Sequence, residues 1–521
     1  MTYRRWRVPH GEVVHDVDGP RIRCGDRERG RDEAMDRAAR IAAGLKGLGV
    51  QPGDRVAVML RNDIEFVEIS LGVALLGGVP VPVNWHWKGG ELAHLFTDSG
   101  ATAAFVHSDL MPTVDDALDR PVPVVEVEPS AALRQAYRLP GPPRSRESGR
   151  PELEAWLAEQ TDRVDAPPTA PLSVIYTSGT TGKPKGILRQ PLAPEQSQGQ
   201  TQRLFSAFGL SPEHRTLVPA PLYHTAPNAH ALFAVAAGLD VTIMPRFEPR
   251  EFLATIARHR IAHTQMVPTM FVRLLALPEA ERRAADLSSL KAVVHAAAPC
   301  PPEVKRRMID WLGPIVLEYY GGSETGAIVF CDSAEWLAHP GTVGRPLEGC
   351  DVKIFLPDGT EAPTGTVGEV YLRPGPSWPD FTYIGNDAKR AEIERDGYLS
   401  IGDGGRLDAD GYLYLSDRIN DMVISGGVNI YPAEIEQCLI TLPGVRDVAV
   451  FGIPDPEFGE SLAAHVDTDP AGGLTEHDIR EHVRRNLAGY KVPKVVVIDR
   501  ELPREESGKL FKRRIRAAYW P

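Results

Sequence analysis

The sequence predicts an α/β fold with a large N-terminal domain of helix-covered β-sheets, a β-rich, barrel-like end to that domain, and a small α+β C-terminal domain. Short apolar runs alternate with amphipathic segments through the first two thirds of the chain, which is typical of largely parallel sheets. Beyond Gly341, Asp-Gly pairs separate β-prone runs and indicate antiparallel hairpins. The 521 residues exceed the ~250–300 that one core supports. We therefore place two domains at residues 1–419 and 420–521.

Apolar runs bounded by turn residues define the elements of the first domain. Helices are expected at residues 64–76 and 301–313, because apolar side chains recur there with helical spacing. A Pro- and Arg-rich stretch at 139–152 has no periodicity and reads as a surface connection. Buried strands are expected at 54–60, 79–83, 101–108, 172–176, 241–245 and 290–297.

The sequence pattern of the last third of the chain differs from that of the first two thirds. The segments 351–363 and 405–415 each place Asp-Gly between β-prone residues, so this region should be antiparallel. Beyond Arg418 the pattern predicts helices at 431–439 and 475–489 and strands at 445–453, 461–467 and 494–499.

Composition excludes several classes of protein. A net charge of -12 argues against a general nucleic-acid binder, which needs a basic face. The scattered cysteines (Cys24, Cys300, Cys331, Cys350 and Cys438) form no zinc-binding pattern and favour a reducing compartment. The most apolar run, 69–83, is shorter than ~20 residues and contains two prolines, so we expect no membrane span. No apolar core follows the basic N-terminus, so we expect no signal peptide and a cytoplasmic protein.

The loop "TSGTTGKPKG", Thr177 to Gly186, follows the apolar run "LSVIY" and has the composition of a phosphate-binding loop. It is not a Walker P-loop, because Thr177 stands where the first glycine is required and Pro184 follows Lys183. The proline also disfavours the helix whose N-terminus would hold the phosphate. Glycines that permit close approach, hydroxyls that donate and lysines that carry charge remain.

This loop resembles the phosphate-binding signature of the adenylate-forming superfamily, which includes acyl-CoA synthetases, luciferases and the adenylation domains of peptide synthetases. The resemblance is closest to bacterial acyl-CoA synthetases and covers nearly the whole chain. Five further segments agree in order: "PLYHTAP" (221–227), "HAAAPCP" (295–301), "YYGGSETG" (319–326), the run from 397 to 436, and "PREESGKL" (503–510).

The resemblance implies ATP-dependent activation of a carboxylic acid to an acyl-adenylate with release of pyrophosphate, then transfer of the acyl group to the thiol of CoA. ATP, Mg²⁺ and the co-substrate CoA are implied with it. Two anions must meet in such a reaction, so cations and hydrogen-bond donors have to be in place beforehand. By resemblance, Lys509 contacts the carboxylate and phosphate oxygens, Ser323 contacts the α-phosphate, and Glu324 is the Mg²⁺ ligand.

Further residues acquire roles from the same match. Tyr320 is expected to stack on adenine, and Asp403 to accept hydrogen bonds from both ribose hydroxyls. His224 matches a gate between acid and nucleotide, and small side chains indicate a pocket for an apolar, possibly bulky acid. The nucleotide set is Thr177, Ser178, Gly179, Thr180, Thr181, Gly182, Lys183, Ala297, Ala298, Pro299, Tyr320, Gly321, Asp403 and Arg418. The substrate set is His224, Asn228, Ala296 and Gly322.

In this superfamily the small domain is mobile and rotates about a hinge, which here is Asn420. Gly426 and Gly427 are expected to line the CoA tunnel, since glycine lets a narrow thiol arm pass the backbone. Asn420 and Val428 depart from the usual residues at their positions. These departures keep open an alternative, a stand-alone acyl-AMP synthetase that passes its product to a carrier protein or partner enzyme.

Other classes fit less well. The sequence does not separate a luciferase-like oxygenase from a ligase. A non-catalytic nucleotide-binding regulator predicts loss of Lys509 or Glu324, and both are present. A P-loop kinase is set aside by Pro184. An oligomer is possible.

Overall fold

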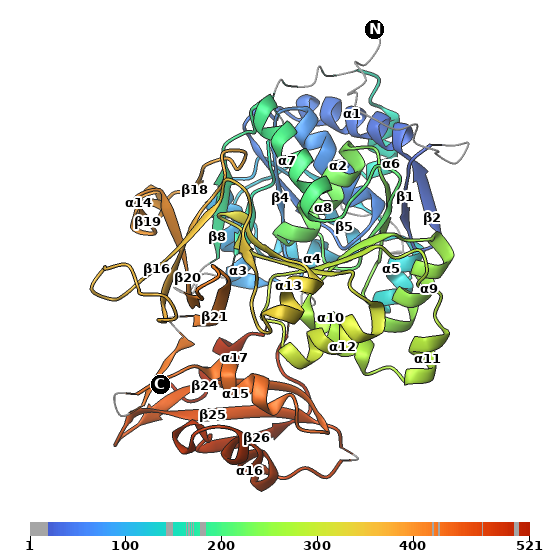
Figure 1. Cartoon of the computed structure of the whole chain (residues 1–521). Coiled ribbons are helices and arrows are strands. Elements are labelled where there is room, and N and C mark those ends of the chain that lie inside the picture. Colours follow the sequence, from blue (N-terminus) through green and yellow to red (C-terminus); the bar gives the residue numbers. More distant parts are fainter. Residues whose placement is uncertain are drawn as a thin grey trace.

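The computed structural model describes residues 19–141, 149–162, 164, 167, 169, 171–177, 184–418, 421–425, 428–470, 472–504 and 510–520. Helices and sheets up to about residue 418 form the large upper body in Figure 1, and the elements after residue 422 form a smaller body beneath it. The predicted boundary at 419/420 lies outside the described residues and remains a prediction.

The largest sheet has a parallel interior and antiparallel edges. Its interior strands run side by side because crossover helices connect them, which is the usual consequence of alternating strands and helices. The order across the sheet is β15 (Arg345–Pro346), β14 (Gly326–Cys331), β13 (Val316–Gly322), β12 (Ala292–His295), β11 (His263–Met266), β9 (Arg215–Val218), β10 (Asp240–Ile243), β1 (Arg21–Cys24) and β2 (Arg27–Gly30).

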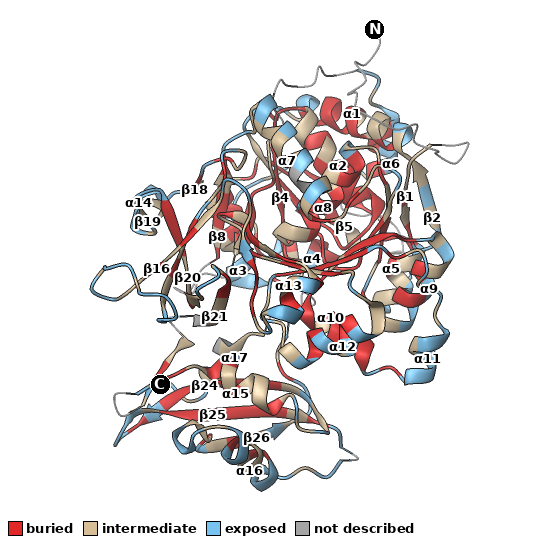
Figure 2. Ribbon diagram, viewed as in Figure 1, coloured by how far each residue is buried: buried red, intermediate tan, exposed pale blue. Residues whose placement is uncertain are grey.

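A second, wholly parallel sheet is stacked beside the first. It runs in the order β4 (Val79–Pro82), β3 (Arg55–Met59), β5 (Ala103–His107) and β6 (Val124–Val127). Helices α1 (Arg31–Gly47) and α2 (Ile64–Leu75) share one buried cluster with strands of both sheets, so they form the layer between them. Figure 2 shows buried residues along both helices and along the strands of the sheets beside them.

Two antiparallel sheets complete the large body. The smaller consists of β18 (Phe381–Tyr383), β8 (Lys185–Arg189) and β7 (Ile175–Thr177), and it brackets the predicted phosphate loop. The other consists of β16 (Asp351–Phe355), β17 (Gly368–Arg373), β20 (Tyr398–Leu407), β19 (Glu394–Arg395) and β21 (Leu413–Arg418). This is the β-rich end that the Asp-Gly turns predict.

Helices cover the sheets and fill the connections. Those of the large body beyond α2 are α3 (Gly89–Ser99), α4 (Met111–Asp115), α5 (Ala131–Tyr137), α6 (Leu153–Ala158), α7 (Pro194–Ala207), α8 (Thr225–Ala236), α9 (Pro249–His259), α10 (Pro268–Leu275), α11 (Glu279–Ala284), α12 (Pro302–Leu312), α13 (Ser333–Ala338) and α14 (Asp387–Glu392).

The smaller body is an α+β unit with its own apolar core. Its sheet runs β23 (Val428–Ile430), β22 (Val423–Ser425), β25 (Gly459–Thr468) and β24 (Val445–Asp455), with β26 (Val495–Asp499) parallel to β25. Helices α15 (Pro432–Leu439), α16 (Glu476–Asn486) and α17 (Lys512–Arg516) pack on it. The strands and helices predicted from the sequence are confirmed here and in the large body.

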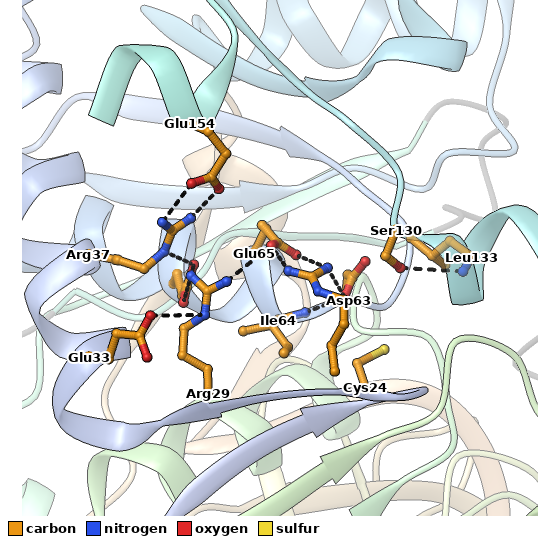
Figure 3. Close-up of polar contacts among 12 residues, drawn as sticks. Cys24, Arg29, Glu33, Arg37, Asp63, Ile64, Glu65, Ser130, Leu133 and Glu154 are labelled. Carbon is orange, nitrogen blue, oxygen red and sulfur yellow. Dashed lines mark hydrogen bonds and ion pairs between the residues drawn. The ribbon is translucent and has the colours of Figure 1, made fainter. Parts of the chain in front are cut away.

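A buried ionic network joins β2, α1 and α2 (Figure 3). The fully buried Glu68 accepts a hydrogen bond from Arg37 at 2.9 Å and lies 3.1 Å from Arg29. Burial raises the pKa of Glu68 to about 7, although both arginines oppose the shift. Asp63 caps the first turn of α2 by accepting from the backbone of Ile64 at 2.8 Å. The network therefore fastens the outer β1–β2 hairpin to the helical layer.

None of the described helices has the length and apolar character needed to cross a membrane. The five cysteines are free thiols, and Cys24 and Cys331 are buried.

Candidate active site

A cleft of about 2200 Å³ runs along the carboxyl ends of the main-sheet strands and reaches the smaller body. Its lining comes from β7, α8, β12, β13 and β20 on the large body, and includes Arg504 and Leu510 on the small one. Strand ends in an open α/β sheet are the usual place for a ligand.

The segment "YYGGSETG" forms the tight β13–β14 hairpin at the centre of the cleft. A side chain on Gly321 would place its Cβ only 1.8 Å from the backbone oxygen of Gly326, so only glycine fits there. The backbone N–H of Gly322 donates to Thr325 Oγ1 at 2.9 Å and closes the turn. The turn thus directs Ser323 and Glu324 into the cleft.

Glu324 is held from two sides. Tyr383 donates its hydroxyl to Glu324 Oε1 at 3.0 Å, and Trp378 donates its indole N–H to the Glu324 backbone oxygen at 3.0 Å. Lys185, within the predicted phosphate loop and at the start of β8, also lines the cleft, and burial lowers its pKa while Glu324 opposes that shift. Glu324 therefore lies beside the strands that bracket the loop.

Ser323 is joined to the start of α8. Its Oγ lies 2.5 Å from Thr225 Oγ1, and its backbone oxygen accepts a hydrogen bond from the buried Arg189. Burial lowers the pKa of Arg189 to about 10, with Glu324 acting in the other direction. The sequence reasoning named Lys185 as one of the two charged residues of the phosphate loop, but it did not single out Thr225 or Arg189. Thr225 is a hydroxyl residue directly after the gate histidine, and Arg189 is a cation at the end of the strand in which the loop ends.

Two residues expected at the nucleoside meet across the cleft. Tyr320 donates its hydroxyl to Asp403 Oδ2 at 2.8 Å, and both residues line the cleft. Asp403 on β20 pairs in register with Arg418 on β21, which brings the backbones of these two predicted residues together. An aromatic face beside a carboxylate is the arrangement that binding of a base and ribose requires.

The segment after β12 turns sharply into the cleft. Ala296, predicted for the substrate set, is almost fully buried and lines the cleft, and so do Ala297, Ala298 and Pro299 of the predicted nucleotide set. Ala297 has φ of 72°, a left-handed conformation that costs a non-glycine residue about 1–2 kcal/mol. Strain of this kind is tolerated where the surrounding structure determines the backbone.

Asparagine side chains hold the segment that leads to His224. Asn62 donates to Ala220 O at 2.9 Å and to Met244 O at 3.1 Å, and accepts from the Leu222 N–H at 2.8 Å. Asn228 donates to Leu222 O at 3.1 Å. His224 itself lines the cleft at the start of α8, and Gly322 also lines the cleft. The predicted substrate residue Asn228 is buried away from the cleft lining, so it positions the segment; sequence reasoning missed Asn62 altogether.

Several predicted residues lie outside the described part of the chain: Ser178, Gly179, Thr180, Thr181, Gly182, Lys183, Asn420, Gly426, Gly427 and Lys509. Of the described residues of the phosphate loop, Thr177, Pro184 and Lys185 line the cleft. Arg504 and Leu510, which bracket the lysine segment, form an isolated β-bridge and also line it.

The residues present suit a magnesium ion bound mainly through phosphate. The described residues contain no group of three or more His, Cys, Asp or Glu side chains able to hold a metal on its own. Glu324 offers one carboxylate in the cleft, and Mg²⁺ commonly takes one or two carboxylates together with substrate phosphates and water.

Two family models match the chain. Residues 20–378 match the AMP-binding enzyme family, and residues 434–509 match the C-terminal domain of AMP-binding enzymes.

Curated relatives extend over almost the whole chain. A feruloyl-CoA synthase from an Amycolatopsis species is 33% identical over 497 residues, 94% of this chain and 93% of its own. A fatty acid–[acyl-carrier-protein] ligase from Streptomyces coeruleorubidus is 31% identical over 525 residues, 97% of this chain and 94% of its own. Among solved structures, an anthranilate CoA ligase in complex with anthranoyl-AMP superimposes with a TM-score of 0.83 at 26% identity, covering 96% of this chain and 94% of that one.

Proposed function

The chain belongs to the AMP-binding enzyme family, and from that membership we propose that it is an ATP-dependent acid:CoA ligase whose cleft forms an acyl-adenylate of an apolar acid. Enzymes of this type use ATP, Mg²⁺ and CoA. Resemblance over 94% of the chain to a feruloyl-CoA synthase supports the reaction class.

One observation carries the proposal. The cleft gathers Tyr320 with Asp403, Glu324, and Ser323 with Thr225 around the strands that bracket the phosphate loop. An aromatic face and carboxylate, a metal-binding carboxylate and paired hydroxyls are the groups that adenosine, Mg²⁺ and an α-phosphate need.

Each side chain acts on the reactants in a distinct way. Asp403 accepts the ribose hydroxyls and Tyr320 supports the base, which fixes the α-phosphate near Ser323. The paired hydroxyls of Ser323 and Thr225 donate to phosphate oxygens as negative charge increases there. Preorganised donors of this kind each contribute about 2.7–4 kcal/mol of transition-state stabilisation. Lys509 supplies the cation that brings the acid's carboxylate and the phosphate together.

Glu324 is the residue that would hold Mg²⁺, whose charge neutralises phosphate oxygens when bound. Tyr383 keeps the Glu324 carboxylate in place by donating a hydrogen bond to it. The Tyr383 phenol stays protonated because burial and the nearby Glu324 raise its pKa. Lys185 adds a positive charge, besides that of the ion, near the same phosphates.

The apolar lining supports an apolar acid. Phe208, Phe247 and Met270 line the cleft together with Val294 and Ala296. The relatives named above act on feruloyl, fatty and anthraniloyl groups according to their names. CoA is the acceptor we propose, and resemblance to an acyl-carrier-protein ligase supports a carrier protein as the second candidate acceptor.

Mass spectrometry of reaction products tests the proposal. Enzyme, MgATP and a pooled set of carboxylic acids are incubated with CoA, with a phosphopantetheinylated carrier protein, or with neither. We expect acyl-CoA only in the CoA reaction, together with AMP and pyrophosphate. Acyl-AMP accumulating equally in all three reactions would instead point to a separate acceptor, and release of ADP would contradict the adenylation chemistry.

A further inference from the structure

Polar side chains line the face of the main sheet that α8 covers. Thr216 on β9 shares its hydroxyl with His230 of α8 at 2.8 Å and with His263 of β11 at 3.1 Å. Next to them, Gln265 of β11 donates its amide N–H to the hydroxyl of Tyr319 on β13 at 2.8 Å. His230, His263, Gln265 and Tyr319 all line the cleft. This polar row is unexpected in a pocket for a plain hydrocarbon.

The histidines of the row carry no charge at neutral pH. Burial lowers the pKa of His230 to about 4 and lowers the pKa of His263 well below its ordinary value. The rings stack with centroids 5.0 Å apart, and His263 Nε2 lies 3.0 Å from the backbone oxygen of Phe208. The row therefore offers hydrogen bonds without ionic charge.

Gln265 and Tyr319 have bonding capacity left over within this row. The Oε1 atom of Gln265 is buried and has no hydrogen-bond partner in the structure. Burial raises the pKa of Tyr319, so its phenol keeps a proton that it can donate. A buried polar atom left without a partner destabilises the protein, and a ligand that pairs with it removes that cost.

We propose that Gln265 and Tyr319 form a hydroxyl-recognition site in the acyl pocket, so that the acid activated by this enzyme carries an alcohol or phenol group at its far end. The hydroxyl donates to Gln265 Oε1 and accepts from the Tyr319 hydroxyl. Either orientation of the Gln265 amide leaves it able to pair with a hydroxyl, which both donates and accepts. This inference rests on the proposed acid:CoA ligase function and names its substrate class.

The pair lies away from the reacting end of the cleft. Tyr319 is three residues before Gly322 on β13, roughly 10 Å along the backbone at about 3.3 Å per residue. Since Ser323 follows Gly322 and marks the reacting end, the pair meets the part of the acid that is remote from the carboxylate. Phe208 packs edge-on against Tyr319 with centroids 5.1 Å apart and supplies an aromatic wall beside this position.

Matched pairs of acids test the site. The pairs are 3-phenylpropanoic acid with its 4-hydroxy and 4-methoxy derivatives, and octanoic acid with 8-hydroxyoctanoic acid. For each acid, kcat/KM is measured by pyrophosphate release with MgATP and CoA, and Kd is measured by calorimetry without ATP. The proteins are wild type, Gln265→Leu, Tyr319→Phe, and Gln200→Leu as a matched control. Gln200 also lines the cleft, but its amide already donates to Ser377 O at 3.1 Å.

We expect wild type and Gln200→Leu to favour the hydroxylated member of at least one pair by tenfold or more, in both kcat/KM and Kd. Gln265→Leu should erase that preference while keeping or improving activity on the unsubstituted acid, and Tyr319→Phe should reduce the preference. A preference absent from every pair, or unchanged in both variants at normal melting temperature, would overturn the inference. Absence of pyrophosphate release with every acid would instead count against the ligase function, and the Kd ratios would still decide whether the hydroxyl site exists.

Discussion

Replacing Asn62 with leucine removes the side chain that holds the segment leading to His224 and Thr225. The amide makes three hydrogen bonds, at 2.9 Å to Ala220 O, 3.1 Å to Met244 O and 2.8 Å from the Leu222 N–H. All three partner residues are buried. A leucine of similar size therefore leaves two carbonyls and one N–H of buried residues without their side-chain partner.

The magnitude follows from these unpaired groups. Each costs about 1–3 kcal/mol, and partial relaxation of the segment brings the expected loss for Asn62→Leu to about 4 kcal/mol. With an unfolding entropy of about 2.1 cal/mol/K per residue, a domain of roughly 400 residues loses about 5 °C in melting temperature. Displacement of the segment should also lower kcat, because Thr225 would no longer align with Ser323.

Calorimetric melting and pyrophosphate release measure the two effects. Asn228→Leu is the matched control, since Asn228 makes a single bond of 3.1 Å to Leu222 O and should cost about 1–2 kcal/mol, or about 2 °C. If Asn62→Leu melts within 1 °C of wild type, or no lower than Asn228→Leu, the assigned holding role is refuted.

Three further predictions concern the reacting end, the central turn and the ionic network. Lys509→Ala should reduce the rate of pyrophosphate release more than 100-fold, while ATP binding measured by calorimetry stays near normal. Near-normal turnover in this variant would remove Lys509 from the mechanism. The control is Lys494→Ala, which breaks an ion pair with Asp455. Gly321→Ala should lower both the melting temperature and the activity, because its Cβ would meet Gly326 O at 1.8 Å. In the control Gly47→Ala the new Cβ meets no atom within 4 Å, so this variant should be neutral. Equal melting temperatures and activities of the two variants would contradict the close approach at Gly321. The pKa of Glu68 is raised from 4.5 to about 7 in the folded protein, so folded Glu68 binds the proton more tightly than unfolded Glu68. Its contribution to the free energy of unfolding is therefore full below pH 4.5 and decreases by about 3 kcal/mol as the pH rises towards 7, at 1.36 kcal/mol per pKa unit. Glu68→Gln should reduce that loss, measured by denaturant titrations at pH 5 and pH 8. An identical pH dependence of stability in wild type and Glu68→Gln would exclude Glu68 as its source.

Much of the fold could be predicted because local patterns coincide with tertiary roles. The run "RVAVM" became the buried strand β3, and the Asp-Gly turns became the hairpins of the β-rich end. Asn228 shows where such reasoning stops: it was predicted to contact the substrate, but its side chain is buried outside the cleft lining and donates to Leu222 O. Asn62 was missed because its hydrogen-bond partners are about 160 to 180 residues away in the sequence, and no local sequence pattern predicts such contacts.

By itself the sequence determined the order of elements, the ordered motifs and hence the family, because these depend on residue type and spacing along the chain. Only the tertiary structure decided which groups meet: Tyr320 with Asp403, Ser323 with Thr225, and Gln265 with Tyr319. The physical reason is that hydrogen bonds and burial depend on distances in space, and packing of separate strands and helices brings together residues that the sequence keeps far apart.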